Sequence, residues 1–185
     1  MLVSEPRTSA RPAKREDIPA IVMIWRTSVS DEEVAGFGTS VAVSIFGDAD
    51  RLSSAWIEPN RVNSEEILVA EIDGRVVGCV EIEERGDELE LVNIDVNREL
   101  QCRGTGTQLV RYVEELAQER GKRAVTLGTS RNSAGVPWKS LPWWQARGYR
   151  ITHEEENEWT RSIGPGVLEI RMRKDLGLGR LPTDV

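Results

Sequence analysis

A glycine-containing turn between a predicted strand and a predicted helix is the part of this chain best suited to chemistry. It follows a β-type run at 88–96 and opens a run at about 105–120 in which apolar residues repeat at helical spacing. Glycines at such a junction leave backbone N–H groups uncovered at the positive end of the helix dipole. Arg103 adds a formal charge there, so the turn predicts a pyrophosphate cradle. Its residues are Gln101, Cys102, Arg103, Gly104, Thr105, Gly106 and Thr107.

Three nucleotide-binding patterns compete for these glycines, beside a fourth interpretation in which the turn is tight and binds nothing. A P-loop requires a lysine after the last glycine, and Thr107 stands there. A dinucleotide fingerprint requires a third glycine where the chain has Leu109. The remaining pattern, Q/R-x-x-G-x-G/A after a strand, is matched by Gln101, Gly104 and Gly106.

The matched pattern resembles the acetyl-CoA signature of the GNAT N-acetyltransferase superfamily. A second segment, Ala-Arg-Pro-Ala-Lys-Arg-Glu-Asp-Ile-Pro-Ala-Ile at 10–21, is similar to the opening strand and helix of many GNAT enzymes. The resemblance covers roughly residues 10–174. It implies the GNAT-like acyl-CoA N-acyltransferase fold.

The order of predicted elements agrees with that fold. Local patterns predict strands at 10–14, 67–72, 75–83, 88–96, 124–128, 149–155 and 167–173, and helices at 17–28, 105–120 and 138–147. The Asp73-Gly74 pair predicts a two-residue hairpin turn. Within 30–60 the apolar spacing is nearly helical but interrupted, at Val41, Ile45, Ala49, Leu52 and Trp56. We expect an α+β protein with a mixed, mostly antiparallel central sheet flanked by helices.

Composition narrows the classes of function. The 185 residues predict one domain over 1–185, with a core at about 10–174 and loose tails at 1–8 and 176–185. No apolar run reaches the ~18 residues of a membrane span, and no signal peptide is expected. A net charge of −7 argues against nucleic acid. Two separated cysteines and one histidine predict no metal site and a cytoplasmic location.

The resemblance implies transfer of an acetyl group from acetyl-CoA to a primary amine. In this superfamily the backbone of the strand before the glycine turn bonds the pantetheine arm and polarises the thioester carbonyl. By position, those contacts fall to Ile94, Asp95 and Val96. The pyrophosphate is expected on Gln101, Arg103, Gly104, Thr105, Gly106 and Thr107.

The attacking amine must lose a proton, and a buried carboxylate with a raised pKa suits that task. The strand 88–96 offers Glu88, Glu90, Asn93 and Asp95. Glu90 falls where histone-type members of the superfamily carry their catalytic glutamate, and we predict it as the base. The alternative is that Glu88 and Glu90 alternate outward on an exposed face. Glu81 and Glu83 on the preceding strand are the fallback candidates.

The segment 132–149 departs from the family pattern. Many members carry N-x-x-A-x-x-x-Y-x-x-x-G-F, whose tyrosine protonates the departing thiolate. Here Gly148-Tyr149 match the end of that pattern, Trp144 replaces the tyrosine, and Pro137 replaces the asparagine. An indole N–H is no useful acid. We therefore expect cofactor contacts from Trp144 and from Asn132, five residues upstream of Pro137, unless the asparagine contact is absent. The alternatives for the tryptophans are ordinary packing, or lining of the acceptor pocket, where their faces attract cationic amines.

The identity of the acceptor is open, and a small-molecule or peptide amine is expected. The acidic run 154–158 favours a cationic small molecule. Acceptor selection is expected from residues 30–60 and from the loop 163–166. A homodimer is an expectation from the resemblance alone. The rival function is a non-catalytic acyl-CoA-binding sensor or docking module, and a protein that binds ATP or NAD on the same glycines is the third possibility.

Overall fold

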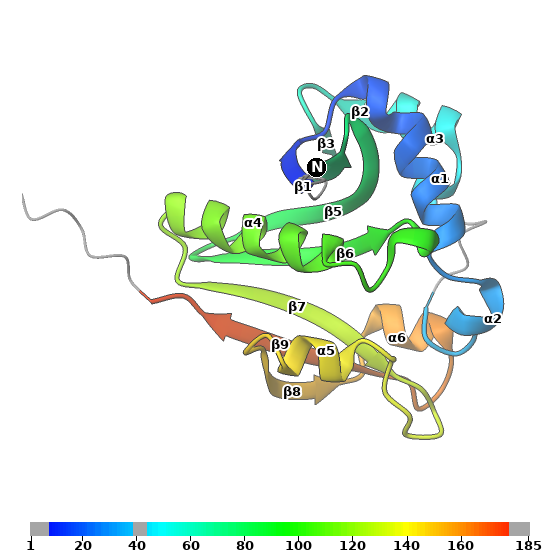
Figure 1. Cartoon of the computed structure of the whole chain (residues 1–185). Coiled ribbons are helices and arrows are strands. Elements are labelled where there is room, and N and C mark those ends of the chain that lie inside the picture. Colours follow the sequence, from blue (N-terminus) through cyan, green and yellow to red (C-terminus); the bar gives the residue numbers. More distant parts are fainter. Residues whose placement is uncertain (1–7, 39–43, 178–185) are drawn as a thin grey trace, which may run out of the picture. The chain divides into compact units, whose positions relative to one another are not determined.

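A computed structural model describes residues 8–38 and 44–177, and it divides them into two compact units (Figure 1). The first unit holds residues 8–33, 44–83 and 92–112, and the second holds 34–38, 84–91 and 113–177. Some predicted features lie outside the described residues: the N-terminal tail apart from Thr8, most of the C-terminal tail, and Val41. A single domain over the whole chain stays a prediction.

The first unit is built on an antiparallel group of strands in the order β2-β3-β4-β5-β6, with β1 paired to β4. The strands are β1 (Thr8–Pro12), β2 (Trp56–Ile57), β3 (Arg61–Val62), β4 (Glu65–Ile72), β5 (Arg75–Arg85) and β6 (Glu88–Val96). β4 and β5 are joined by Asp73 and Gly74, both at positive φ, as a two-residue hairpin of the predicted kind requires. β6 gives residues 92–96 to this unit and residues 88–91 to the second.

Helices of the first unit cover the strands with apolar side chains. They are η1 (Arg15–Asp17), α1 (Ile18–Ser28), η3 (Ile45–Gly47), α3 (Ala49–Ala55), η4 (Arg98–Leu100) and the first half of α4 (Thr105–Glu119). In Figure 1 α1 and α3 lie side by side. Ile21, Ile24 and Leu52 are fully buried with Ile67 and Val69 of β4. This packing is expected, because helix amphipathicity turns one apolar face toward the sheet.

The second unit is built on strands in the order β6-β7-β9-β8. β7 (Ala124–Arg131) runs parallel to β6, whereas β9 (Leu168–Asp175) is antiparallel to β7 and to β8 (Arg150–Glu155). Its helices are the second half of α4, α5 (Leu141–Gln145) and α6 (Glu158–Ile163), and α2 (Asp31–Val34) ends where the unit begins. Together these pairings confirm the predicted mixed, mostly antiparallel sheet with flanking helices.

The structure corrects several predicted elements. Within the described residues of 30–60, where the apolar spacing was nearly helical but interrupted, the chain forms the short helices α2, η3 and α3 and the strand β2. The strand predicted at 124–128 continues to Arg131, because Thr129 and Ser130 are buried and pair with β9. The helix predicted at 138–147 shortens to α5, since the Trp138 N–H bonds the Ser130 carbonyl. α6 was not predicted, although Asn157 and Thr160 form a capping box at its start.

Candidate functional site

The glycine turn adopts a backbone that exposes the start of α4. Cys102 has φ 62° and Gly104 has φ 93°, both in the left-handed region. In the described structure the helical hydrogen bonds of α4 begin with the Gln108 N–H, which donates to the Gly104 carbonyl at 3.0 Å. The N–H groups of the first turn therefore point out of the helix end, as at any helix N-terminus. This is the geometry that binds phosphate oxygens.

Two features of the turn fit a bound anion, and a third indicates a functional position. The Arg103 side chain is exposed beside the helix start. A Cβ on Gly104 would meet no atom within 4 Å, so the space in front of that backbone is open. Thr105 is buried, and its hydroxyl has no hydrogen-bond partner among the described residues. A buried polar atom without a partner is rare in folded proteins and is often found at functional positions. Because this hydroxyl is closed to solvent, we assign the anion contacts to the amides and to Arg103.

Gln101 takes a positioning role in the structure. Its amide donates to the Ser28 carbonyl at 2.9 Å and to the Val96 carbonyl at 3.1 Å. The side chain therefore ties the turn to the end of α1 and to the end of β6. The Asn97 N–H donates to the Val77 carbonyl at 2.9 Å and anchors the same junction on β5.

Gly78 on β5 sets how closely α4 approaches the strands. A Cβ there would lie 3.0 Å from Leu109 Cδ1, 3.1 Å from the Asp95 carbonyl oxygen and 3.4 Å from Thr105 Cγ2. Only a residue without a side chain leaves room for α4 and β6 at these distances. Gly78 therefore positions α4, a role that none of the sequence motifs indicates. Its signal in the sequence was an isolated glycine inside a predicted strand.

A polar cluster lies where β6 meets the end of α1. The Ser28 hydroxyl donates to Asp95 Oδ1 at 2.6 Å, and the Asn93 amide donates to Asp95 Oδ2 at 2.6 Å. Burial raises the pKa of the Asp95 carboxyl above its ordinary value, and the two hydrogen bonds oppose this shift because they favour the charged form. Asp95, expected to bond the pantetheine arm through its backbone and offered as one of four polar candidates on β6, presents an acidic side chain whose two oxygens both accept hydrogen bonds.

Glu81 on β5 belongs to the same cluster and is almost wholly buried, with 1% of its surface exposed. Trp25 Nε1 donates to Glu81 Oε1 at 3.3 Å, and Oε2 has no partner among the described residues. Burial, and then the negative charge of Asp95, raise the pKa of Glu81 well above its ordinary value. Hydrogen bonding by Trp25 and Asn93 opposes the shift without cancelling it. The Glu81 carboxyl therefore keeps its proton to higher pH than an ordinary glutamate does.

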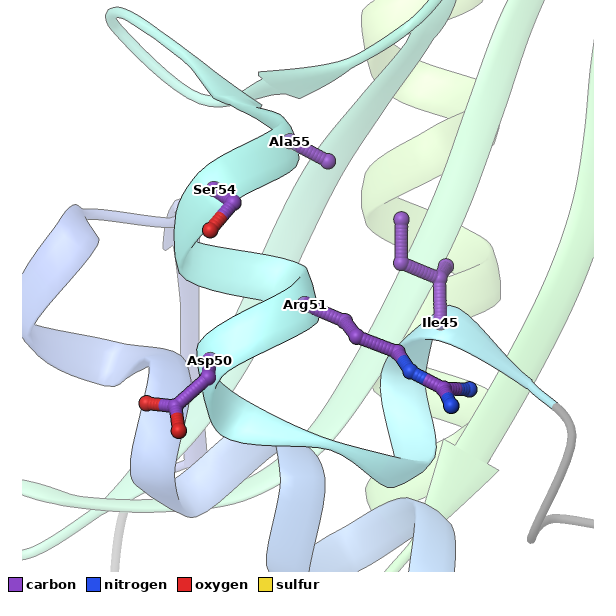
Figure 2. A pocket seen from close by; sticks show the side chains of 5 residues that line it. All are labelled: Ile45, Asp50, Arg51, Ser54 and Ala55. Atoms are coloured by element: carbon purple, nitrogen blue, oxygen red, sulfur yellow. The ribbon is translucent and has the colours of Figure 1, made fainter.

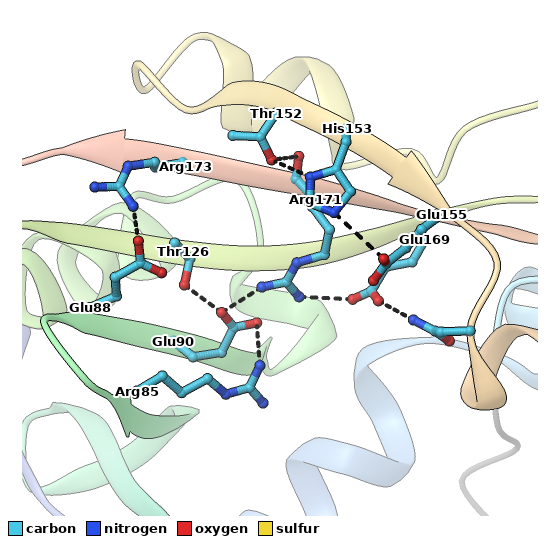
Figure 3. A network of polar contacts seen from close by, with 11 residues as sticks. Arg85, Glu88, Glu90, Thr126, Thr152, His153, Glu155, Glu169, Arg171 and Arg173 are labelled. Carbon is cyan, nitrogen blue, oxygen red and sulfur yellow. Dashed lines mark hydrogen bonds and ion pairs between the residues drawn. The ribbon is translucent and has the colours of Figure 1, made fainter.

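Glu90 lies in the second unit, in the network of Figure 3. Its Oε2 accepts a hydrogen bond from Thr126 at 2.5 Å and one from Arg171 at 2.7 Å, and Arg85 stands 3.8 Å from Oε1. Arg171 also donates to Glu169. A buried carboxylate with a guanidinium partner is already satisfied, and these contacts favour a structural role. Catalysis by Glu90 stays a prediction.

Asn132 and Trp144, the two cofactor contacts predicted beyond α4, also lie in the second unit. Asn132 Oδ1 accepts hydrogen bonds from the N–H groups of Ala134 and Val136, so it shapes its own loop. Trp144 is buried and packs edge-on against Trp143 and Tyr149, at ring-centroid distances of 4.6 and 5.2 Å. This arrangement is ordinary aromatic packing. Cofactor contacts from Asn132 and Trp144 stay predictions.

Tyr149 is poorly suited to protonate the departing thiolate. Its hydroxyl donates to Glu114 Oε1 at 3.1 Å, and Lys174 donates to both oxygens of the same carboxylate. Burial raises the pKa of Tyr149 further above its ordinary value, and the charge and hydrogen bond of Glu114 add to the shift.

The region expected to select the acceptor carries an open pocket on the first unit. Figure 2 shows its lining side chains on α3 and η3, which are Ile45, Asp50, Arg51, Ser54 and Ala55. Nearby, Trp25 of α1 stacks on Phe46 of η3, with ring centroids 5.0 Å apart. No helix in the described part of the chain is long and apolar enough to cross a membrane. Across residues 8–38 and 44–177, no three His, Cys, Asp or Glu side chains are grouped to hold a metal ion.

The fold agrees with what comparison with known proteins shows. Residues 44–136 match the sequence model of the Acetyltransferase (GNAT) family, and the chain belongs to that family. It is also 35% identical over 85 residues to a probable N-acetyltransferase camello of Xenopus laevis. That match covers 44% of this chain and only 37% of the relative's length.

Solved structures show the same fold. The PaiA N-acetyltransferase of Thermoplasma acidophilum, solved in complex with coenzyme A, superposes with a TM-score of 0.66 at 17% identity, covering 92% of this chain and 99% of its own. The ribosomal-protein-S18-alanine N-acetyltransferase of Escherichia coli gives a TM-score of 0.64 at 16% identity, covering 97% and 100%. At these identities the likeness concerns the fold alone.

The ion pair of Glu90 predicts a loss of stability on substitution. In Glu90→Gln, Arg171 stays largely buried without its counterion, and breaking such a pair is strongly destabilising. We expect the free energy of unfolding to fall by about 3 kcal/mol in urea titrations. Glu84→Gln is the matched control, because Glu84 is an exposed partner of Lys122 and Arg120. Its loss should stay below about 1 kcal/mol, and equal losses in the two variants would contradict the structural role.

Burial of Glu81 predicts a pH-dependent stability. The folded protein keeps the Glu81 proton at pH values where the unfolded chain, with an ordinary pKa of 4.5, releases it. The folded state then binds more protons, so the Glu81 contribution falls as pH rises above about 4.5. Glu81→Gln should become more stable relative to the wild type between pH 5 and pH 8.

The control for this series is again Glu84→Gln. Lys122 lowers the pKa of Glu84, so its contribution is present above the ordinary pKa and is lost as pH falls. The stability difference from the wild type should therefore change in the opposite direction. A Glu81→Gln difference that stays constant with pH would show that Glu81 titrates normally in the folded protein.

Proposed function

We propose that the chain is an acetyl-CoA-dependent N-acetyltransferase that acetylates a primary amine, with a cationic small molecule as acceptor. The observation that carries the proposal is the start of α4. Uncovered amides and the exposed Arg103 lie there, in a chain of the GNAT family. The complex of the similar PaiA fold with coenzyme A supports the choice of ligand.

The proposed roles follow the geometry of the turn. Amides and side chains of Arg103, Gly104, Thr105, Gly106 and Thr107 receive the pyrophosphate, and Gln101 holds the turn in place. The backbone at the end of β6, from Ile94 to Val96, aligns the acyl arm and polarises its carbonyl. The ligand itself supplies an activated acetyl thioester. The protein must orient it, bring in the amine and take up a proton.

The charge of the chain supports a cationic acceptor. The net charge is −7, and four of the five residues at 154–158 are glutamates. Glu154 pairs with Arg131 at 2.7 Å, while Glu155 and Glu156 remain largely exposed. Such a field raises the local concentration of cations and repels acidic acceptors. A free thiol on the exposed Cys102 is compatible with the reducing cytoplasm predicted from the sequence.

A non-catalytic acyl-CoA sensor is the second candidate. The engagement of Tyr149 by Glu114 and the burial of Trp144 favour it, because neither group is placed in the described structure as an acid for a leaving thiolate. The enzyme interpretation does not require one, since a thiol with a pKa near 8.5 leaves readily and can take its proton from water. Thiol release with a library of amines separates the two candidates. Acetyl-CoA binding without turnover on any amine would favour the sensor.

Arg103 provides a direct test of the cradle. Arg103→Gln removes a charge at the helix start, and we expect acetyl-CoA to bind about tenfold more weakly in calorimetry, with a reduced dependence on salt. Arg111→Gln is the control, because Arg111 is an exposed arginine further along α4. It should bind normally. Competition by ATP or NAD would favour a nucleotide-binding protein, and no binding of acetyl-CoA at millimolar concentration would overturn the proposal.

The predicted role of Glu90 has its own kinetic test. If Glu90 is the base, Glu90→Gln should lower kcat by roughly 100-fold while the Kd for acetyl-CoA stays unchanged, because the proton transfer is lost and the cradle is not touched. Turnover is measured by thiol release and scaled to the folded fraction, since the same variant is expected to be less stable. Unchanged turnover per folded molecule would remove Glu90 from the mechanism.

A further inference from the structure

Glu81 and Asp95 are carboxyl groups on the neighbouring strands β5 and β6 of the first unit, and Glu81 is buried whereas Asp95 is half-buried. Both have their pKa raised by burial, and the charge of Asp95 raises that of Glu81 further. Other titratable groups face the pair: Glu65 of β4 raises the pKa of Glu81, and the buried Cys79 thiol, whose own pKa the pair raises, lies two residues away on β5. The α1 groups that contact the pair, Trp25 and Ser28, are neutral.

The two members of the pair are not equivalent. Asp95 accepts short hydrogen bonds on both oxygens, from Ser28 and Asn93, and such donors stabilise a carboxylate. Glu81 accepts a long bond from Trp25 on Oε1 and a further contribution from Asn93, while its Oε2 has no partner among the described residues. Two carboxyl groups in one buried cluster cannot both ionise readily. The negative charge therefore settles on Asp95, and Glu81 keeps the proton.

We propose that Glu81 and Asp95 share one proton and one negative charge, and that this pair takes the proton from the ammonium group of the acceptor. The inference rests on the proposed N-acetyltransferase function and assigns to the pair the role that the sequence predicted for Glu90. The contacts distinguish the two candidates. Glu90 is held by a guanidinium, whereas the donors to the Asp95 carboxylate, Ser28 and Asn93, are neutral.

The position of the pair suits a cationic amine. Asp95 is the penultimate residue of β6, on the strand end expected to polarise the thioester, and it belongs to the same unit as the glycine turn. Asp95, Asn93 and Trp25 are half-buried, so the cluster reaches the surface on one side. Trp25 stacks on Phe46, within the segment expected to select the acceptor. An aromatic face beside a carboxylate attracts an ammonium group.

The proton balance of the step is complete. The ammonium group gives one proton to the Asp95 carboxylate, which leaves a neutral amine and two neutral carboxyl groups. The amine nitrogen then forms a bond to the thioester carbonyl carbon as the carbon–sulfur bond breaks. The thiolate takes up the second nitrogen proton, directly or through water, to give the free thiol. The pair returns its proton to solvent before the next turnover.

The first experiment combines substitutions of the two residues in the full-length protein. Asp95→Asn should lower kcat at pH 7 by roughly 100-fold with an unchanged Kd for acetyl-CoA. Activity should recover at higher pH, because Glu81, with the more strongly raised pKa, remains as a base. The double variant Glu81→Gln/Asp95→Asn should lose that recovery. Glu66→Gln, another buried glutamate on β4, is the matched control and should keep wild-type turnover.

A milder variant tests the same inference without removing either carboxyl group, in case Asp95→Asn does not fold. Ser28→Ala removes one donor from the Asp95 carboxylate, so the pKa of Asp95 rises. We expect the acidic limb of the kcat/KM profile for the acceptor to move to higher pH by about one unit, with maximal kcat retained. A purely structural Ser28 would lower stability without moving the limb. Carboxyl-labelled NMR titration of the protein without ligands should show one carboxyl that keeps its proton at pH 7.

The outcomes separate the inference from the proposed function. If wild-type protein binds acetyl-CoA and acetylates an amine, but Asp95→Asn and the double variant turn over normally, the inference is overturned and the function stands. Two carboxyl groups that both titrate near pH 4 in the NMR experiment would also overturn it. If the wild-type protein fails to bind acetyl-CoA or to acetylate any amine, the proposed function fails first, and the NMR titration still decides whether the shared proton exists.

Discussion

The site depends on one constraint, which is that α4 must begin at the glycine turn with its first amides uncovered and its first turn pressed against β5. Gly104 supplies the left-handed backbone, and Gly78 supplies the space. Gln101 then fixes the turn by bonding the carbonyls of Ser28 and Val96. Because these contacts join α1, β5, β6 and α4, they fix the proposed anion cradle and the acidic cluster at the end of β6 relative to each other within the first unit.

The molecule buries carboxylates in two different ways. Glu90 is buried with Arg171 and Thr126, so its charge is compensated within the second unit. Glu81 is buried in the first unit with an oxygen left free and a second carboxyl nearby. The first arrangement is typical of a structural ion pair. The second destabilises the fold as pH rises and is typical of a functional site, where perturbed pKa values are retained because the chemistry uses them.

The sequence predicted those parts of the fold that local patterns determine. β6 was predicted at its observed bounds, and the Asp73-Gly74 turn was predicted from its two residues. α4 ends within one residue of its prediction, and Gly121 follows it at positive φ. α6 was missed although its capping box is a local signal, whereas the end of β7 was missed because tertiary contacts decide it. Thr129 and Ser130 are polar, yet they are buried and continue the strand through pairing with β9.

The acidic pair shows why the candidate site was harder to predict than the fold. Glu81 and Asp95 are fourteen positions apart, and the groups that set their different states, Trp25 and Ser28, come from a helix more than fifty residues earlier. Alternation along β6 could place Asp95 on a face but could not say which helix covers that face. The signal present in the sequence was weaker: Glu81 is an acid inside the apolar run Val76–Ile82. Such a residue departs from the pattern of its strand, and a departure of this kind is expected where function outweighs stability.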